Sequence, residues 1–328
     1  MEAGARVDIS VVVPLYNEKD NLPDLHRQLS EALAPLGRPF ELVLVDDGSR
    51  DGTREALIEL AGRDARVQPV ILRRNFGQTA AFSAGFDRSR GDLVVTSDGD
   101  LQNDPADIPA LVAKLEADEL DMVCGWRRTR RDPLSKRIPS FFANRLISWA
   151  TGVTLHDYGC SLKVMRGELA RGLRLYGEMH RFIPAVASWT GVSLAEVPVN
   201  HRARTRGSSK YGIGRTVRVL LDLFTVKFLH SYGTRPAHLF GLMGLASGAL
   251  GFGLLAYLSV LKVFFDEAIG GRPLLLLGAL LFLTGVVLVC FGLIGELLVR
   301  IWHESQEKPI YAIEERRARR SQPGANAR

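Results

Sequence analysis

Two aspartates, Asp98 and Asp100, are separated by one glycine and follow the short apolar run Leu93–Thr96. The run predicts a buried strand that delivers both carboxylates to one edge of a sheet. Residues two apart in an extended chain face the same side, so both side chains can offer oxygens to one divalent cation and its phosphate ligands. An Asp-Gly-Asp sequence also favours a turn, and the motif alone does not separate the two interpretations.

The elements that must position this pair repeat a unit of strand, loop and helix. Apolar runs predict five strands, and helical spacing of apolar residues follows four of them. This alternation predicts an α/β fold with a parallel, doubly wound sheet that has its functional loops at the carboxyl ends of the strands. The predicted strands are Ile9–Val13, Phe40–Val45, Val67–Leu72, Leu93–Thr96 and Met122–Gly125, and the predicted helices are Leu22–Leu33, Thr53–Ala61, Gln78–Arg88 and Ile108–Leu115.

The loops after these strands are acidic. No G-x-G-x-x-G follows the first strand and no G-x-x-x-x-G-K-[ST] occurs, which argues against a dinucleotide oxidoreductase and a P-loop NTPase. Carboxylates beside a phosphate ligand require a cation between them. The acidic residues at the strand ends are Glu18, Asp46, Asp47, Asp98 and Asp100.

The last third of the chain is dominated by apolar residues. Leu239–Leu261 and Pro273–Gly295 are uncharged, and each is long enough as a helix to cross about 30 Å of hydrocarbon. More basic residues lie beyond the outer ends of these segments than in the short connector Lys262–Arg272, which predicts a cytoplasmic head, cytoplasmic termini and an external connector. No signal-peptide pattern opens the sequence, so the head is not expected to be exported.

Two basic clusters lie between the predicted sheet and the first apolar segment. The first consists of Arg127, Arg128, Arg130, Arg131, Lys136 and Arg137, and the second consists of Arg202, Arg204, Arg206, Lys210, Arg215 and Arg218. The formal net charge of +6 could suggest a nucleic-acid partner. Anionic lipid and phosphate substrates explain the charge equally well, and we expect no nucleic acid. The second cluster contains the small-residue loop Gly207–Tyr211, whose backbone can approach an anion closely. Apolar positions at helical spacing then predict an interfacial helix directly before the first span.

Several motifs in a fixed order carry a resemblance to a known family. They are Val12-Val13-Pro14-Leu15-Tyr16-Asn17-Glu18, Val45-Asp46-Asp47-Gly48-Ser49, Arg74-Asn75-Phe76-Gly77, Asp98-Gly99-Asp100-Leu101-Gln102, Arg204-x-x-Gly207-x-Ser209-Lys210-Tyr211 and Gly292-Leu293-Ile294-Gly295-Glu296. With them the chain resembles membrane-anchored family-2 glycosyltransferases, which move a sugar from a nucleotide onto a polyprenyl phosphate. Asp157–Leu162 and Arg181–Pro184 look most like the branch that transfers 4-deoxy-4-formamido-L-arabinose to undecaprenyl phosphate; bactoprenol glucosyltransferases and dolichol-phosphate mannose synthases are also similar.

The resemblance implies an organisation for the whole chain. A GT-A type nucleotide-diphospho-sugar transferase domain is expected in the cytoplasm, followed by the interfacial helix, two transmembrane helices and a basic cytoplasmic tail. The protein is then a bacterial inner-membrane enzyme of envelope glycan or lipid A modification. The expected boundaries are 1–212 for the domain, 213–235 for the interfacial helix, 236–265 and 273–301 for the spans, and 302–328 for the tail.

The resemblance also implies roles for individual residues. The base and ribose pocket is expected to be lined by Pro14, Tyr16, Glu18, Asp46 and Asp47, with Asp98 also on the nucleotide. Mg²⁺ or Mn²⁺ would be held by Asp98, Asp100 and Gln102, and Asp100 also counts as catalytic. The lipid phosphate would be held by Arg127, Arg137, Arg204, Ser209 and Lys210, and Asp157 would lie near the transferred sugar.

The implied reaction is a single displacement. A lipid-phosphate oxygen attacks the anomeric carbon, the nucleoside diphosphate leaves, and the configuration inverts. A phosphate monoester with a second pKa of about 6 is already mostly dianionic at neutral pH, so a general base is not required. Asp157 is therefore a base or an orienting carboxylate, with a structural turn role as the alternative.

Other functions and properties stay open at this stage. A processive polysaccharide synthase or a lipid-linked sugar flippase is the main alternative, although the two spans are few for a pore and Q-x-x-R-W is absent. A third possibility is a nucleotide-binding scaffold without activity. The donor can be a UDP- or a GDP-sugar. Gly241, Gly244, Gly248 and Gly251 could support close helix packing in a homo-oligomer, but glycine is also common in membrane helices.

Overall fold

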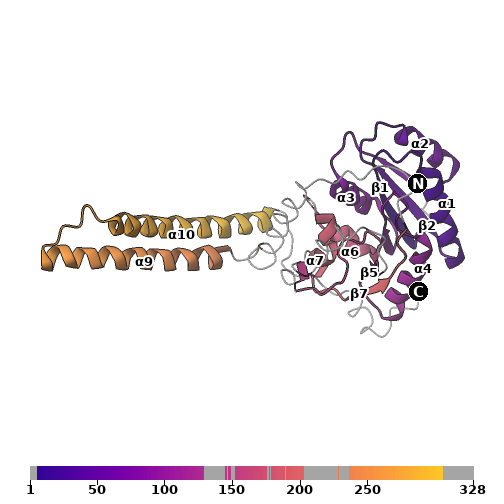
Figure 1. The fold of residues 1–328 in the computed structure, drawn as a ribbon. Helices are drawn as coiled ribbons and strands as arrows, with labels where there is room; N and C mark the ends of the chain where they lie inside the picture. The colour runs from indigo at the N-terminus through magenta and orange to yellow at the C-terminus, as the bar shows by residue number, and fades with distance from the viewer. Residues whose placement is uncertain are drawn as a thin grey trace. The chain divides into compact units, whose positions relative to one another are not determined.

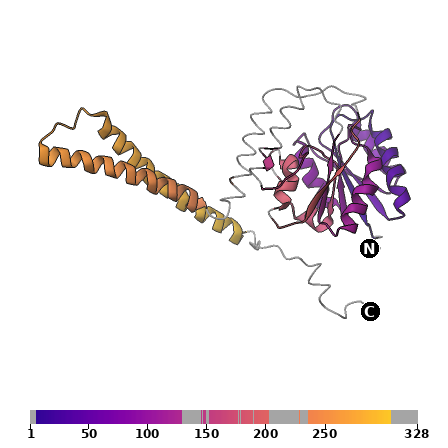
Figure 2. The ribbon, with the colours of Figure 1, turned by 60° about the horizontal axis from the view of Figure 1, so that its bottom comes forward.

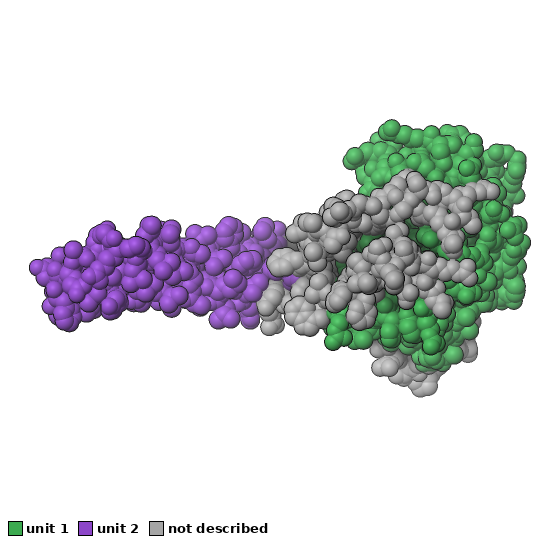
Figure 3. Space-filling view, in the orientation of Figure 1, with its two compact units in different colours: residues 1–224 green, residues 225–328 purple. Residues whose placement is uncertain are grey.

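The computed structural model describes residues 6–128, 145, 147–148, 152–175, 177, 179–188, 190–202, 228 and 236–305. The chain divides into two compact units, Met1–Phe224 and Thr225–Arg328, which are green and purple in Figure 3. The predicted interfacial helix over 213–235 lies outside the described residues except for Phe228. The predicted tail also lies outside them beyond Ser305.

Unit 1 is built on a seven-stranded sheet with the order β3-β2-β1-β4-β6-β5-β7 (Figure 1). β1 is parallel to β2 and β4, and β2 is parallel to β3. β6 runs antiparallel to β4 and β5, and β7 is parallel to β5. The predicted, mostly parallel sheet is confirmed. The strands are β1 Ile9–Leu15, β2 Phe40–Asp46, β3 Val67–Ile71, β4 Leu93–Thr96, β5 Met122–Trp126, β6 Lys163–Arg166 and β7 Leu194–Pro198.

Helices cover both faces of this sheet (Figure 2). α1 (Leu22–Leu33), α2 (Thr53–Arg63) and α4 (Ile108–Ala117) bury their leucines in one core with alternate residues of β1, β2 and β4. α3 (Gln78–Arg88) covers the other face of β1, where a Cβ added to Gly85 would lie 2.2 Å from Cγ1 of Val12. The central strands β1, β2 and β4 are mostly apolar because both of their faces are buried. α6 (Gly167–Gly172) and α7 (Ile183–Ser188) follow β6.

The strand order reverses next to β1. β2 and β3 extend the sheet on one side of β1, and β4 begins the other side. In open α/β sheets, ligands bind in the crevice outside the carboxyl ends of the strands at such a reversal. Leu15 pairs with Asp46, and Val12 pairs with Thr96, so the loops after β1, β2 and β4 leave the same edge of the sheet.

Unit 2 contains two helices, α9 (Pro236–Phe265) and α10 (Pro273–Ser305), that are long and apolar enough to cross a membrane. Glycines bring their backbones together. A Cβ added to Gly251 would lie 2.4 Å from the backbone nitrogen of Phe282, and one added to Gly285 would lie 2.5 Å from that of Gly248. These glycines therefore form contacts within one chain, and the homo-oligomer stays a prediction.

Candidate active site

The loop after β1 is fixed to the loop after β2. Asn17 has φ 57°, a left-handed conformation that asparagine tolerates. Its backbone N–H donates to Oγ of Ser49 at 2.9 Å, and its Oδ1 accepts from the backbone N–H of Arg50 at 2.9 Å. The backbone N–H of Glu18 donates to Oγ1 of Thr53 at 3.0 Å, at the start of α2. The two loops that the sequence assigns to the nucleotide therefore form one rigid rim.

The carboxylates of Asp46 and Asp47, at the end of β2, bind neighbouring parts of the chain. The buried Asp46 carboxylate accepts from Nε of Arg54 at 3.4 Å. The two oxygens of Asp47 accept from the backbone N–H groups of Phe76 and Gly77 at 2.7 and 2.9 Å. Burial raises the pKa of Asp47, and the two amides oppose this shift. In this structure both carboxylates organise loops, and their predicted contact with the nucleotide stays a prediction.

Two glycines let the loops approach each other closely. Gly48 has φ +69°, and a Cβ there would lie 2.3 Å from the carbonyl carbon of Arg74. A Cβ on Gly99 would lie 2.6 Å from Cδ2 of Leu15 and 3.2 Å from the backbone oxygen of Pro14. The loop after β4 is thus in direct contact with the end of β1, and the loops after β2 and β3 are in direct contact with each other. Tyr16 is exposed at the end of β1.

The acidic pair lies on a turn. β4 ends at Thr96, and Gly99 and Asp100 form a turn that continues into Leu101 with φ 61°. The backbone N–H of Gln102 donates to Oδ1 of Asp100 at 3.2 Å. The predicted extended geometry of the pair is therefore wrong, because the chain leaves the strand before Asp98. The predicted strand Leu93–Thr96 is confirmed, and the turn at Gly99 and Asp100 leaves the role of the pair as a prediction.

Asp98 and Asp100 have the chemistry of a partial metal site. Burial and the charge of Asp100 raise the pKa of Asp98, while Ser161, Lys163 and Arg127 oppose the shift. Within the part of the chain that the structure describes, no group of three or more His, Cys, Asp or Glu side chains gathers as a complete metal site. Mg²⁺ is commonly bound by one or two carboxylates together with substrate phosphates. The pair fits the protein's share of such a site.

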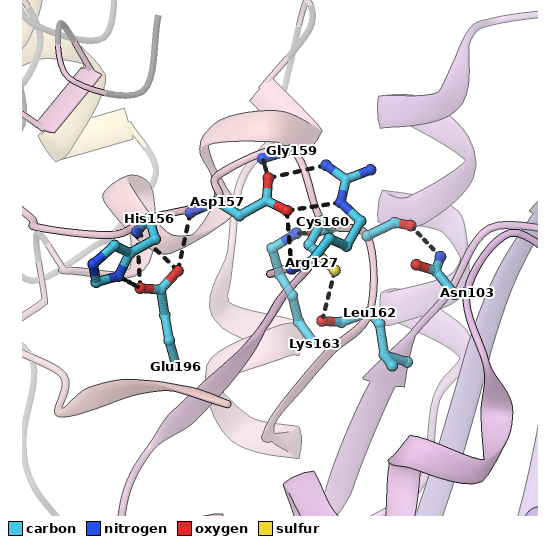
Figure 4. A network of polar contacts seen from close by, with 10 residues as sticks. Asn103, Arg127, His156, Asp157, Gly159, Cys160, Leu162, Lys163 and Glu196 are labelled. Atoms are coloured by element: carbon cyan, nitrogen blue, oxygen red, sulfur yellow. Dashed lines mark hydrogen bonds and ion pairs between the residues drawn. The ribbon is translucent and has the colours of Figure 1, made fainter. Parts of the chain in front are cut away.

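A buried ion pair joins Arg127, directly after β5, to Asp157, in the segment before β6 (Figure 4). Nε of Arg127 lies 2.7 Å from Oδ2 of Asp157, and its Nη2 lies 2.9 Å from Oδ1. Only 1% of the Asp157 side chain and 16% of the Arg127 side chain are exposed. The backbone N–H of Gly159 also donates to Asp157, at 3.2 Å. The Asp157 carboxylate and most of the Arg127 guanidinium are thus engaged with each other.

Glu196 of β7 holds the loop that carries Asp157 (Figure 4). Its carboxylate accepts from the backbone N–H of Asp157 at 3.1 Å, from the backbone N–H of His156 at 2.8 Å, and contacts Nδ1 of His156 at 2.8 Å. The His156 ring stacks on Trp126 with 4.3 Å between ring centroids. Sequence reasoning missed Glu196 because no motif surrounds it and β7 was not predicted.

Sequence reasoning also missed two further basic side chains, Lys163 and His180, of which Lys163 acts electrostatically on Asp98. Lys163 of β6 is buried, and its Nζ donates to the backbone oxygen of Cys160. Nδ1 of His180 lies 2.7 Å from Oγ1 of Thr79 at the start of α3. Burial lowers the pKa of His180 to about 3, and the charges of Arg181 and Lys163 act in the same direction. A lone lysine within the apolar run Leu162–Met165 is the signal that could have found Lys163.

Arg202, the first residue of the second basic cluster, is bound to the loop that follows β4 and contains Asp98 and Asp100. The backbone N–H of Arg202 donates to the backbone oxygen of Gln102 at 2.9 Å, and its guanidinium pairs with Asp104 at 2.6 Å. The backbone N–H of Asn200 donates to Asp107 at 2.7 Å. Four of the predicted ligands of the lipid phosphate lie outside the described residues. They are Arg137, Arg204, Ser209 and Lys210.

Solved structures share this fold. A glucosyl-3-phosphoglycerate synthase from Mycobacterium tuberculosis, in complex with Mn²⁺, UDP-glucose and phosphoglyceric acid, matches with TM-score 0.51 at 21% identity and covers 68% of this chain and 79% of that chain. Mannosyl-3-phosphoglycerate synthase from Rubrobacter xylanophilus matches with TM-score 0.52 at 15% identity, over 68% and 74% of the two chains. The expected GT-A type α/β fold is confirmed.

Relatives of similar length match nearly the whole chain. Dodecaprenyl-phosphate galacturonate synthase of Rhizobium johnstonii is 45% identical over 94% of this chain and 92% of its own. Undecaprenyl-phosphate 4-deoxy-4-formamido-L-arabinose transferase of Pseudomonas paraeruginosa is 42% identical over 97% and 92%. The profile of Glycosyl transferase family 2 matches residues 10–171. The chain therefore belongs to glycosyl transferase family 2.

Proposed function

We propose that the protein transfers a sugar from a UDP- or GDP-sugar to polyprenyl phosphate, with inversion and with the help of a divalent cation, at the cytoplasmic face of a bacterial inner membrane. One observation carries the proposal: the acidic pair lies where the strand order reverses between β1 and β4. This is the edge at which an α/β sheet binds its ligand. The pair provides anionic oxygens there, as a cation on a diphosphate requires.

The rim formed by the loops after β1 and β2 binds the nucleoside in this proposal. Tyr16 is exposed there and offers a ring for contact with the base, whereas Asp46 and Asp47 keep the rim in place. Mg²⁺ or Mn²⁺ at Asp98 and Asp100, with Gln102 in the same loop, would neutralise negative charge on the diphosphate leaving group. Gly99 keeps this loop against the rim, so the nucleoside and its phosphates bind to adjoining parts of one surface.

Asp157 acts as a positioning residue in this proposal. Both of its oxygens accept from Arg127, and Asp157 is almost completely buried, so neither oxygen is placed to take a proton from an acceptor. The lipid phosphate is mostly dianionic at neutral pH and needs no base. Asp157 instead holds the Arg127 guanidinium in one orientation, from which Arg127 stabilises the anionic substrates.

The acceptor site is proposed for the second basic cluster together with Arg137. Arg202 is bound to the loop after β4, and the chain continues from it to Arg204, Ser209 and Lys210. This continuity supports a lipid phosphate bound near the donor. The two apolar helices would anchor the enzyme in the membrane that contains its acceptor. The names of the relatives suggest galacturonate and 4-deoxy-4-formamido-L-arabinose as the first sugars to test.

The test uses the purified full-length protein in vesicles that contain undecaprenyl phosphate. Labelled UDP- and GDP-sugars are supplied one at a time with Mg²⁺, Mn²⁺ or EDTA, and the lipid product is separated and its anomeric configuration determined. One sugar per lipid, inverted and formed only with metal, supports the proposal. A long lipid-linked polymer would support the processive synthase instead, and nucleotide binding without transfer of any donor would support the scaffold.

A further inference from the structure

The first residues of α3 contact two acidic groups of the site. The backbone N–H of Gly77 donates to Asp47 at 2.9 Å. Nε2 of the next residue, Gln78, donates to Oδ1 of Asp98 at 2.7 Å. In the proposed function, Asp98 binds a cation, and this depends on where its oxygens point. The residue that donates to this carboxylate can therefore affect cation binding.

We propose that Gln78 is a positioning residue that orients the Asp98 carboxylate toward the divalent cation. This inference rests on the proposed metal-dependent transfer. A carboxylate offers about four lone-pair directions. Gln78 takes one on Oδ1, and Ser161 also contacts Asp98. These two donors come from different elements and restrain the rotation of the carboxylate, leaving defined directions for a cation.

Gln78 is itself held firmly. Gly77 is fixed by Asp47, and Oγ1 of Thr79 lies 2.7 Å from Nδ1 of His180. Further along the helix, Gly85 packs directly on Val12 of β1. These contacts hold the backbone of α3 against the sheet and so fix the point from which the Gln78 side chain extends. A rigid second layer of this kind tunes a metal ligand rather than merely filling space.

The Gln78 amide holds Oδ1 of Asp98 directly. Without this donor the Asp98 carboxylate is restrained less, and its oxygens no longer keep one direction. Loss of such an outer-layer partner typically weakens metal binding about 10–100-fold.

The experiment measures Mn²⁺ binding to the full-length protein by electron paramagnetic resonance, with UDP present and in parallel with GDP. Gln78→Met removes the amide donor but keeps an unbranched side chain that suits a helix. Gln68→Met, on the edge strand β3, is the matched control. Gln78→Leu is the second variant, used if Gln78→Met does not give folded protein.

We expect Gln78→Met to weaken Mn²⁺ binding about 10–100-fold at an unchanged melting temperature, and Gln68→Met to bind like the wild type. Mn²⁺ binding by Gln78→Met within about twofold of the wild type would overturn the inference alone, a margin far below the effect of a lost outer-layer partner. A wild type that binds no Mn²⁺ with either nucleotide would overturn the metal-dependent function and the inference with it.

Discussion

The ion pair between Arg127 and Asp157 allows positioning to be separated from proton transfer. Asp157→Asn leaves the Arg127 guanidinium in a site where only 16% of its side chain is exposed, without its carboxylate partner. Breaking a buried ion pair by removing one partner costs about 3–5 kcal/mol, because the remaining charge is uncompensated. The unit that contains the pair spans Met1–Phe224, and for a domain of this size each kcal/mol shifts the melting temperature by about 2–4 °C. The expected loss is therefore about 6–20 °C.

The assay is thermal unfolding followed by tryptophan fluorescence. Trp126 stacks on His156, next to Asp157, and reports on this region. Arg127→Met should also destabilise, and the double variant should be more stable than the sum of the two changes predicts, because it leaves neither charge alone. In the transfer assay, Asp157→Asn should lower kcat without removing an ionisation from the pH profile of kcat/KM.

Two results would refute this reasoning. Additive effects in the double variant would mean that the two side chains do not depend on each other. A pH profile that loses one of its limbs in Asp157→Asn would show that this carboxylate moves a proton in the reaction.

Three further predictions follow from the packing and the pKa values. The pKa of His180 is about 3 in the folded protein against 6.5 for the free group, so the unfolded chain takes up a proton below pH 6.5 and the free energy of unfolding falls there. From pH 7 to 5 the wild type should therefore lose about 2 kcal/mol more of its free energy of unfolding than His180→Gln, as measured by denaturant titration. Equal losses in the two proteins would contradict the burial of His180. Gly48→Ala should destabilise the protein by about 1–3 kcal/mol more than Gly37→Ala. Both glycines have positive φ, but only a Cβ on Gly48 would lie 2.3 Å from a backbone atom, the carbonyl carbon of Arg74. Equal melting temperatures of the two variants would disprove this close approach. Gly251→Val should lower the melting temperature in detergent, whereas Gly253→Val should not. A Cβ on Gly251 would contact the backbone of α10, and a Cβ on Gly253 has no atom within 4 Å. A larger effect of Gly253→Val would mean that the two helices pack through another face.

The sequence predicts the first half of the fold closely. Leu93–Thr96 and Gln78–Arg88 have the predicted bounds, because apolar runs between polar loops mark buried strands and helices clearly. β1 and β2 extend two residues and one residue past their predicted ends, to Leu15 and Asp46. β6 and β7 were not predicted, because one contains a buried lysine and the other a glutamate, which break the apolar pattern.

The candidate site was predicted at the level of loops, and the structure adds the contacts between them. Asp98 and Asp100 follow β4 as expected, but their turn geometry depends on Gly99 packing against Leu15, a contact between segments far apart in the sequence. The pairing of Arg127 with Asp157 has the same origin, since β5 and β6 bring two distant loops together. Such tertiary contacts are not encoded in local periodicity, so a single sequence does not reveal them.

In the proposed function, the acidic pair binds the cation of a polyprenyl-phosphate sugar transfer. The most direct measurement is the rate at which labelled sugar enters lipid with Mn²⁺, with EDTA, and for Asp98→Asn against the control Asp92→Asn, an exposed aspartate just before the other end of β4. We expect full activity for Asp92→Asn and a loss of at least 100-fold, about 2.7 kcal/mol of barrier, for Asp98→Asn and for EDTA alike. Transfer that persists in EDTA and in Asp98→Asn would show that the acidic pair does not bind a required cation.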